Sequence, residues 1–108
     1  MFDTVRNRFY VLDEEGTPVP EPDVLKWARS FESDRTLKQD ELSNGTVIST
    51  VFLGINHSWD DRGPPILWET MIFGGPHDED QYRYSSREAA LAGHDKAVAL
   101  ASGIPAKN

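Results

Sequence analysis

Two β-rich segments, residues 47–55 and 66–75, constrain the fold of this chain more than any other feature. Both carry large apolar side chains on successive positions, a pattern typical of strands that are buried on both faces. The loop between them ends in Gly-Pro-Pro at residues 63–65, and proline disrupts strand pairing. We therefore expect the second strand to begin after this turn and to return antiparallel to the first. Glu69 lies in the middle of the second strand, where an unpaired carboxylate would be costly to bury.

The remaining elements can be placed around this pair of strands. Asn44 and Gly45 favour a tight turn before the first segment, and Ser85 and Glu88 match a capping box at the start of a helix. The expected strands cover residues 8–12, 35–42, 46–55 and 66–73, and the expected helices cover residues 23–33 and 85–101. The order β-α-β-β-β-α predicts one α+β domain over residues 1–108. It contains a four-stranded, mostly antiparallel sheet with two helices packed on one face.

The second central strand carries large apolar groups on both of its faces. Trp68 and Ile72 alternate with Met71 and Phe73, and alternate residues of a strand point to opposite faces. Two helices on one face leave the other face uncovered, so we expect a homodimer, with Trp68 and Ile72 at the interface. The alternative is that loops and the N-terminal arm cover this face.

Composition excludes several classes of protein. The 108 residues contain no cysteine, which rules out disulfides, thiolate nucleophiles and cysteine-bound zinc. The net charge of −7 disfavours binding to a nucleic-acid backbone, although the acidic clusters could imitate nucleic acid toward a basic partner. The sequence has neither a membrane-spanning apolar run nor a signal-peptide core, so a cytoplasmic location in a host cell is expected. No cofactor is expected.

A pairing of Glu69 with His94 is the main catalytic candidate. His94 falls within the apolar stripe of the C-terminal helix, so its imidazole should face the sheet. A carboxylate beside an imidazole can serve acid–base chemistry. The competing interpretation is a buried polar contact that fixes the helix on the sheet.

The loop at residues 56–65 is the main binding candidate. It places Trp59 among polar residues, with His57 and Arg62 close by. Exposed tryptophan and arginine are favoured interface anchors, and Arg35, expected at the same end of the sheet, could join Arg62 in holding an anion. The alternative is that Trp59 folds back as a lid on the core. No metal site is expected, because the two loops that contain histidine and acidic residues should lie at opposite ends of the sheet.

Several segments resemble small uncharacterised proteins encoded by bacteriophages and prophages. The segments that carry the resemblance are residues 49–54, 63–65, 68–75, 83–85 and 88–94. The resemblance spans about residues 9–98 and implies a viral or mobile-element origin. It supplies no catalytic residues.

These observations favour a non-enzymatic phage accessory protein. It would act by binding a host protein or a small anionic ligand, and counteracting a bacterial defence system is one form of that role. The alternatives are a small enzyme or a nucleotide-binding sponge, with a pocket near Glu69 and His94 or at the loop that contains His57 and Arg62. A structural role in the virion is a third possibility.

Overall fold

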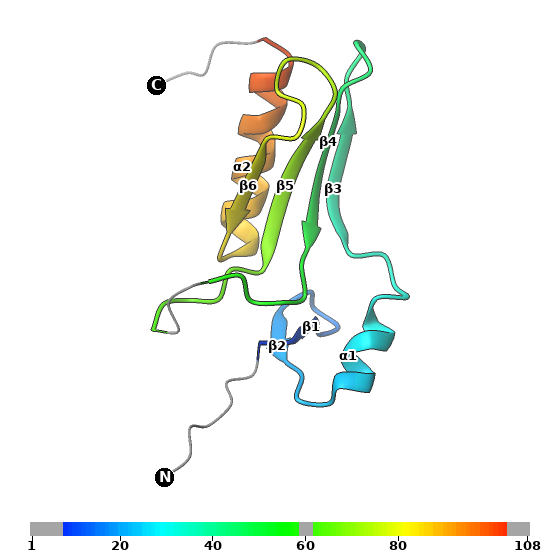
Figure 1. The fold of residues 1–108 in the computed structure, drawn as a ribbon, viewed down its shortest axis with the longest axis vertical. Helices are drawn as coiled ribbons and strands as arrows, with labels where there is room; N and C mark the ends of the chain where they lie inside the picture. Colours follow the sequence, from blue (N-terminus) through cyan, green and yellow to red (C-terminus); the bar gives the residue numbers. More distant parts are fainter. Residues whose placement is uncertain (1–7, 59–61, 104–108) are drawn as a thin grey trace.

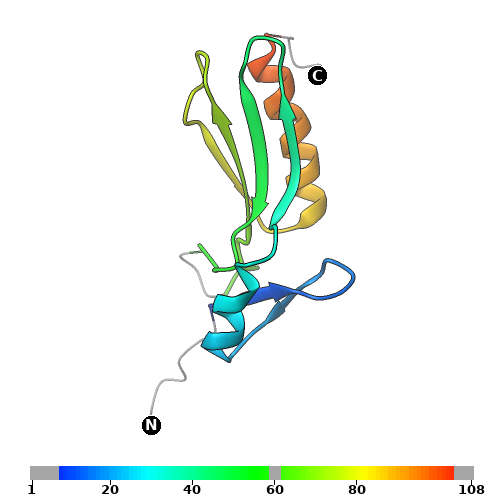
Figure 2. The ribbon, with the colours of Figure 1, turned by 90° about the vertical axis from the view of Figure 1, so that its right-hand side faces the viewer.

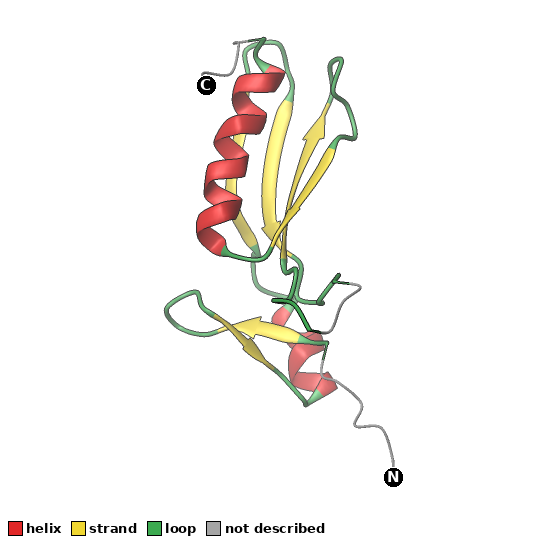
Figure 3. Cartoon of the chain, turned by 90° about the vertical axis from the view of Figure 1, so that its left-hand side faces the viewer, coloured by secondary structure: helices red, strands yellow, loops and turns green. Residues whose placement is uncertain are grey.

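The computed structural model describes residues 8–58 and 62–103 and confirms the α+β class (Figure 1). The main sheet contains the strands β3 (Thr36–Glu41), β4 (Val47–Phe52), β5 (Trp68–Phe73) and β6 (Gln81–Tyr84). They pair in sequence order, and each pair is antiparallel. The C-terminal helix α2 (Arg87–Ala101) packs along one face of this sheet (Figure 3).

The N-terminal elements form a small unit at one end of the main sheet (Figure 2). Strands β1 (Tyr10–Leu12) and β2 (Pro18–Pro20) form an antiparallel hairpin, and helix α1 (Val24–Ser30) lies against β1. Two details of the prediction are therefore wrong. The strand near residues 8–12 does not join the main sheet, whose fourth strand is β6, and α1 does not cover the sheet. With seven residues and no buried side chain, α1 lacks an apolar face wide enough for that role.

Helix α2 begins one residue later than the capping box predicts. Ser86 rather than Ser85 caps the helix, and its Oγ accepts a hydrogen bond from the backbone N–H of Ala89 at 3.0 Å. Within the helix, Gly93 lies directly against Tyr84 of β6. A Cβ at Gly93 would overlap a ring carbon and the hydroxyl oxygen of Tyr84. In the part of the chain that the structure describes, neither α1 nor α2 is long and apolar enough to cross a membrane.

The core lies between α2 and the two central strands. One buried cluster contains Phe52, Leu67, Trp68 and Ala90, and the other contains Ile48, Ile72 and Ala97. Trp68 and Ile72 are 1% and 0% exposed, so the prediction that they form a dimer interface is wrong. They face the sheet's own helix because the register pairs Trp68 with Phe52 and Ile72 with Ile48, which places all four side chains on one face.

The opposite face of the sheet carries a second set of apolar side chains. Val47 and Val51 of β4 and Met71 of β5 are half-buried, and Phe73 is 46% exposed. These residues alternate with the buried ones along both strands. Among the described residues, no helix packs on this surface (Figure 2). We call it the open face.

Candidate functional site

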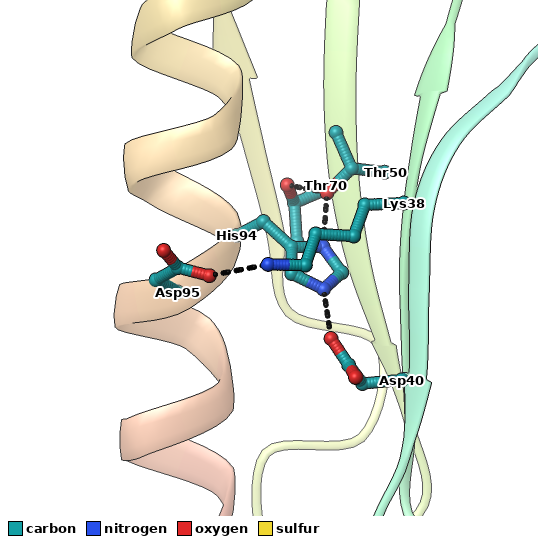
Figure 4. Close-up of polar contacts among 6 residues, drawn as sticks. All are labelled: Lys38, Asp40, Thr50, Thr70, His94 and Asp95. Carbon is teal, nitrogen blue, oxygen red and sulfur yellow. Dashed lines mark hydrogen bonds and ion pairs between the residues drawn. The ribbon is translucent and has the colours of Figure 1, made fainter.

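A buried polar network centred on His94 lies between α2 and the sheet (Figure 4). His94 Nδ1 lies 2.7 Å from Thr50 Oγ1, and His94 Nε2 lies 2.7 Å from Asp40 Oδ2. The hydroxyl oxygens of Thr50 and Thr70 are 2.5 Å apart. Side chains from β3, β4, β5 and α2 therefore form one continuous chain of hydrogen bonds.

The contacts of His94 assign a role to each ring nitrogen. A carboxylate only accepts hydrogen bonds, so Nε2 donates to Asp40, and Nδ1 either accepts from the hydroxyl of Thr50, in the neutral ring, or donates to it, in the charged ring. With the neutral ring, Thr50 in turn accepts a hydrogen bond from Thr70. In this tautomer every contact joins a donor to an acceptor, which is the condition for burying polar groups at low cost.

A hydroxyl, an imidazole and a carboxylate linked in this order are also the arrangement that activates a nucleophile in some enzymes. Here Thr50, Thr70 and His94 have no exposed surface, so a substrate cannot reach the hydroxyl of Thr50 in this structure. Solvent reaches the network at Asp40, whose side chain is 43% exposed. The network joins α2 to three strands of the sheet.

An ion pair next to the network joins the same two elements. Lys38 Nζ of β3 donates to Asp95 Oδ1 of α2 at 3.0 Å (Figure 4). This hydrogen bond, together with the charge of Asp95, raises the pKa of Lys38 above its usual value. Both side chains are largely exposed, so the pair contributes little to stability.

Glu69 does not pair with His94, contrary to the prediction. Glu69 lies on the open face, where its Oε2 accepts a hydrogen bond from Arg83 Nε at 2.9 Å. Trp68 and Thr70 occupy the inward positions of β5, so strand alternation directs Glu69 outward. The two candidate catalytic residues are thus on opposite sides of the sheet.

The loop that contains His57 is closed by backbone and side-chain hydrogen bonds. The Asn56 side chain accepts from the backbone N–H groups of Ser58 and Ile66, and His57 donates its backbone N–H to Ile66. Burial lowers the pKa of His57, and the positive charge of Arg83 lowers it further. His57 therefore tends to be neutral.

Arg35, one of the two arginines predicted to hold an anion at this loop, contacts backbone carbonyls and an aromatic ring. Arg35 Nη1 donates to the backbone carbonyls of Phe52 and Leu53, at 3.2 and 3.0 Å, and its guanidinium lies 3.9 Å from the ring centre of Phe31. Arg35 therefore fixes the junction between α1 and the sheet. Trp59 lies outside the described residues, and Arg62 is exposed.

The described residues show no cluster of metal ligands. Within residues 8–58 and 62–103, no three or more His, Asp or Glu side chains are arranged to hold a metal ion. His77 Nδ1 and Asp80 Oδ2 contact each other at 3.2 Å, and Asp78 Oδ1 accepts from the backbone of Gly74. These contacts stabilise the turn before β6.

The true partners of His94 were missed by reasoning from the sequence. No local pattern in the sequence marks Asp40, Thr50 or Thr70, which are isolated polar residues. The turn at Asn44 and Gly45 nevertheless contains the signal, because extending its register places Asp40 opposite Ile48 on the inward face. Thr50 and Thr70 are likewise cross-strand partners on that face.

Comparison with known proteins adds no relative. No family model, curated protein or solved structure matches this chain.

Proposed function

We propose that this chain is a non-enzymatic binding protein whose working form is a homodimer joined through the open faces of two sheets. The observation that carries this proposal is the exposure of Phe73 beside Val47, Val51 and Met71, on a face that no described helix covers. A contiguous apolar surface in a small domain marks an interaction site.

The chemistry of the open face favours a second copy as its occupant. A twofold interface brings the same patch of two chains together, so the patch must be self-complementary. The chain as a whole carries a net charge of −7, which opposes self-association. On the open face, however, the charges of Glu69 and Arg83 compensate each other, the centre is apolar, and Glu41 lies on the edge strand opposite Val47. Two copies can meet here with little like-charge contact.

The enclosed His94 network supports binding over catalysis. Its hydroxyl groups are fully buried, and Glu69 forms an ion pair with Arg83. The resemblance to phage-encoded proteins supports an accessory role in an infected cell. Under this proposal the dimer acts on a host component, and interference with a bacterial defence system is one such action.

Light scattering coupled to size-exclusion chromatography tests the dimer. We expect the wild-type protein to have twice the mass of one chain, and Phe73→Asp to have the mass of one chain with the circular-dichroism spectrum of the folded wild type. Leu25→Asp is the matched control, because Leu25 is 64% exposed but lies on α1. A wild-type monomer at high concentration would refute the proposal, as would a Phe73→Asp dimer.

A further inference from the structure

The two ends of the open face differ in charge. The strand register aligns a row of residues across the sheet at each end. At the end beside the β5–β6 turn the row contains Glu41, Val47 and Phe73. At the other end it contains Val51, Glu69 and Arg83. The rows are four residues apart along β5, which is about 14 Å at roughly 3.4 Å per residue.

The end beside the β5–β6 turn is acidic. Glu41 is exposed at the end of β3, and the turn adds Asp78, Glu79 and Asp80. Asp78 and Asp80 accept hydrogen bonds from neighbouring groups of the turn and of β6. Glu41 and Glu79 are exposed, and neither forms an ion pair within the described part of the chain. We call these two residues the acidic end.

The opposite end of the open face carries an accessible cation. Arg83 donates through Nε to Glu69, but its side chain is 43% exposed, whereas that of Glu69 is 12% exposed. A guanidinium has five N–H donors, so Arg83 can bind a second carboxylate. Its charge is also felt locally, because burial and then Arg83 lower the pKa of His57 and outweigh the opposite effect of Glu69.

Symmetry leaves two ways to stack such a face on its own copy with the strands aligned. Aligned sheets keep their strand directions within about 30° of the same line. If the twofold axis runs along the strands, the acidic end of one copy lies over the acidic end of the other. If the axis runs across the strands, the acidic end of each copy lies over the Arg83 end of its partner. Juxtaposed like charges disfavour the first arrangement, and opposite charges favour the second.

We infer that the two open faces pack with their strands in opposite directions, so that Arg83 of each copy binds the acidic end of the other. Sheets pack about 10 Å apart, a gap that side chains from both faces can fill. In this arrangement α2 of each copy forms an outer layer, and the two N-terminal units lie at opposite ends of the dimer (Figure 2). The inference rests on the proposed dimer and adds the residues that determine its orientation.

Charge substitutions at the acidic end test the contact. Glu41→Lys combined with Glu79→Lys changes the net charge from −7 to −3, because each substitution adds two positive charges. General repulsion between chains falls, yet we expect the dimer to weaken at least about tenfold, because each lysine then faces Arg83 of the partner. Glu14→Lys with Glu15→Lys is the matched control, with the same charge change at exposed positions of the N-terminal hairpin. Its dimer should be at least as tight as the wild type.

Sedimentation equilibrium at low ionic strength measures the dissociation constants, and Arg83→Gln supplies a change of sign. In the wild-type background Arg83→Gln should weaken the dimer, since it removes the cation and leaves a donor for Glu69. In the background with lysine at both positions of the acidic end it should tighten the dimer, since it removes a repulsion. Within one chain these charges are about 14 Å apart along the sheet, beyond the Debye length of about 10 Å at 0.1 M salt. Equal weakening in both backgrounds would overturn the inference.

Cross-linking tests the direction of the strands, because the chain contains no cysteine of its own. Val47→Cys and Val51→Cys chains are mixed, treated with a short bismaleimide and mapped by mass spectrometry. We expect links between position 47 of one chain and position 51 of the other. Links from position 47 to itself, in a protein that is dimeric, would overturn the inference and leave the proposed dimer standing. A monomeric wild type would overturn both, and a Phe73→Asp dimer would reject the open face as the interface.

Discussion

Replacing Gly93 with alanine should destabilise this protein, although helix propensity alone predicts the reverse. Alanine is favoured over glycine by about 1 kcal/mol inside a helix. At Gly93, however, the new Cβ would overlap the ring and hydroxyl of Tyr84. Tyr84 pairs with Trp68 across the strands and packs on the same core cluster, so it cannot move away without opening that core. Overpacking costs about 1–3 kcal/mol, and overlap with several ring atoms belongs at the upper end.

The net expectation for Gly93→Ala is a loss of about 2 kcal/mol in the free energy of unfolding, obtained by setting an overpacking cost of about 3 against a propensity gain of about 1. For a domain of this size that lowers the melting temperature by about 8 °C. Urea denaturation followed by circular dichroism measures the change. Tyr84→Leu supplies the control background, since it removes the overlapping atoms and should make Gly93→Ala neutral or stabilising. Unchanged or increased stability of Gly93→Ala in the wild-type background would refute the reasoning.

Two further predictions concern the buried network and the histidine of the loop. Thr50→Val should lower the free energy of unfolding by about 2–4 kcal/mol, because it leaves His94 Nδ1 and a second buried threonine hydroxyl without a partner. Ser49→Ala, the next residue but on the open face, should change stability by less than about 0.5 kcal/mol, and equal losses in the two variants would contradict the network. NMR titration should place the pKa of His57 below 6.5, because burial and Arg83 disfavour its protonated form. The unfolded chain then binds the proton more readily, so stability falls as the pH drops below about 6.5, and this part of the dependence should vanish in His57→Gln.

The elements with strong local signals are those that the sequence predicts well. Apolar β-rich runs identify β4 and β5, and the proline turn between them indicates the antiparallel return. The apolar stripe and capping residues identify α2 to within about two residues. Strand β6 is not predicted from the sequence, because its four residues, Gln-Tyr-Arg-Tyr, alternate too briefly to be distinguished from the acidic loop before them. It becomes a strand through pairing with β5.

The candidate site shows the limit of local reasoning more clearly. Helical spacing correctly directs His94 toward the sheet, where it is fully buried. The predicted pairing of His94 with Glu69 is wrong. The sequence does not show which face of the sheet Glu69 occupies until the register of β5 is known. A pocket between residues 15–18 and 85–88 joins segments about 70 residues apart, so the sequence contains no signal for it.

The sequence by itself determined the class of this protein, because strand and helix formation follow from apolar periodicity, turn residues and helix caps within a few positions of each residue. It also determined that an apolar sheet face would exceed what the helices can cover. Only the tertiary structure decided which face that is. Trp68 and Ile72 lie beneath α2, and Met71 and Phe73 remain on the open face, because the inward side of a strand is set by packing against a helix distant in the chain. The same packing gives His94 its partners and leaves the indole N–H of Trp68 buried without a hydrogen-bond partner.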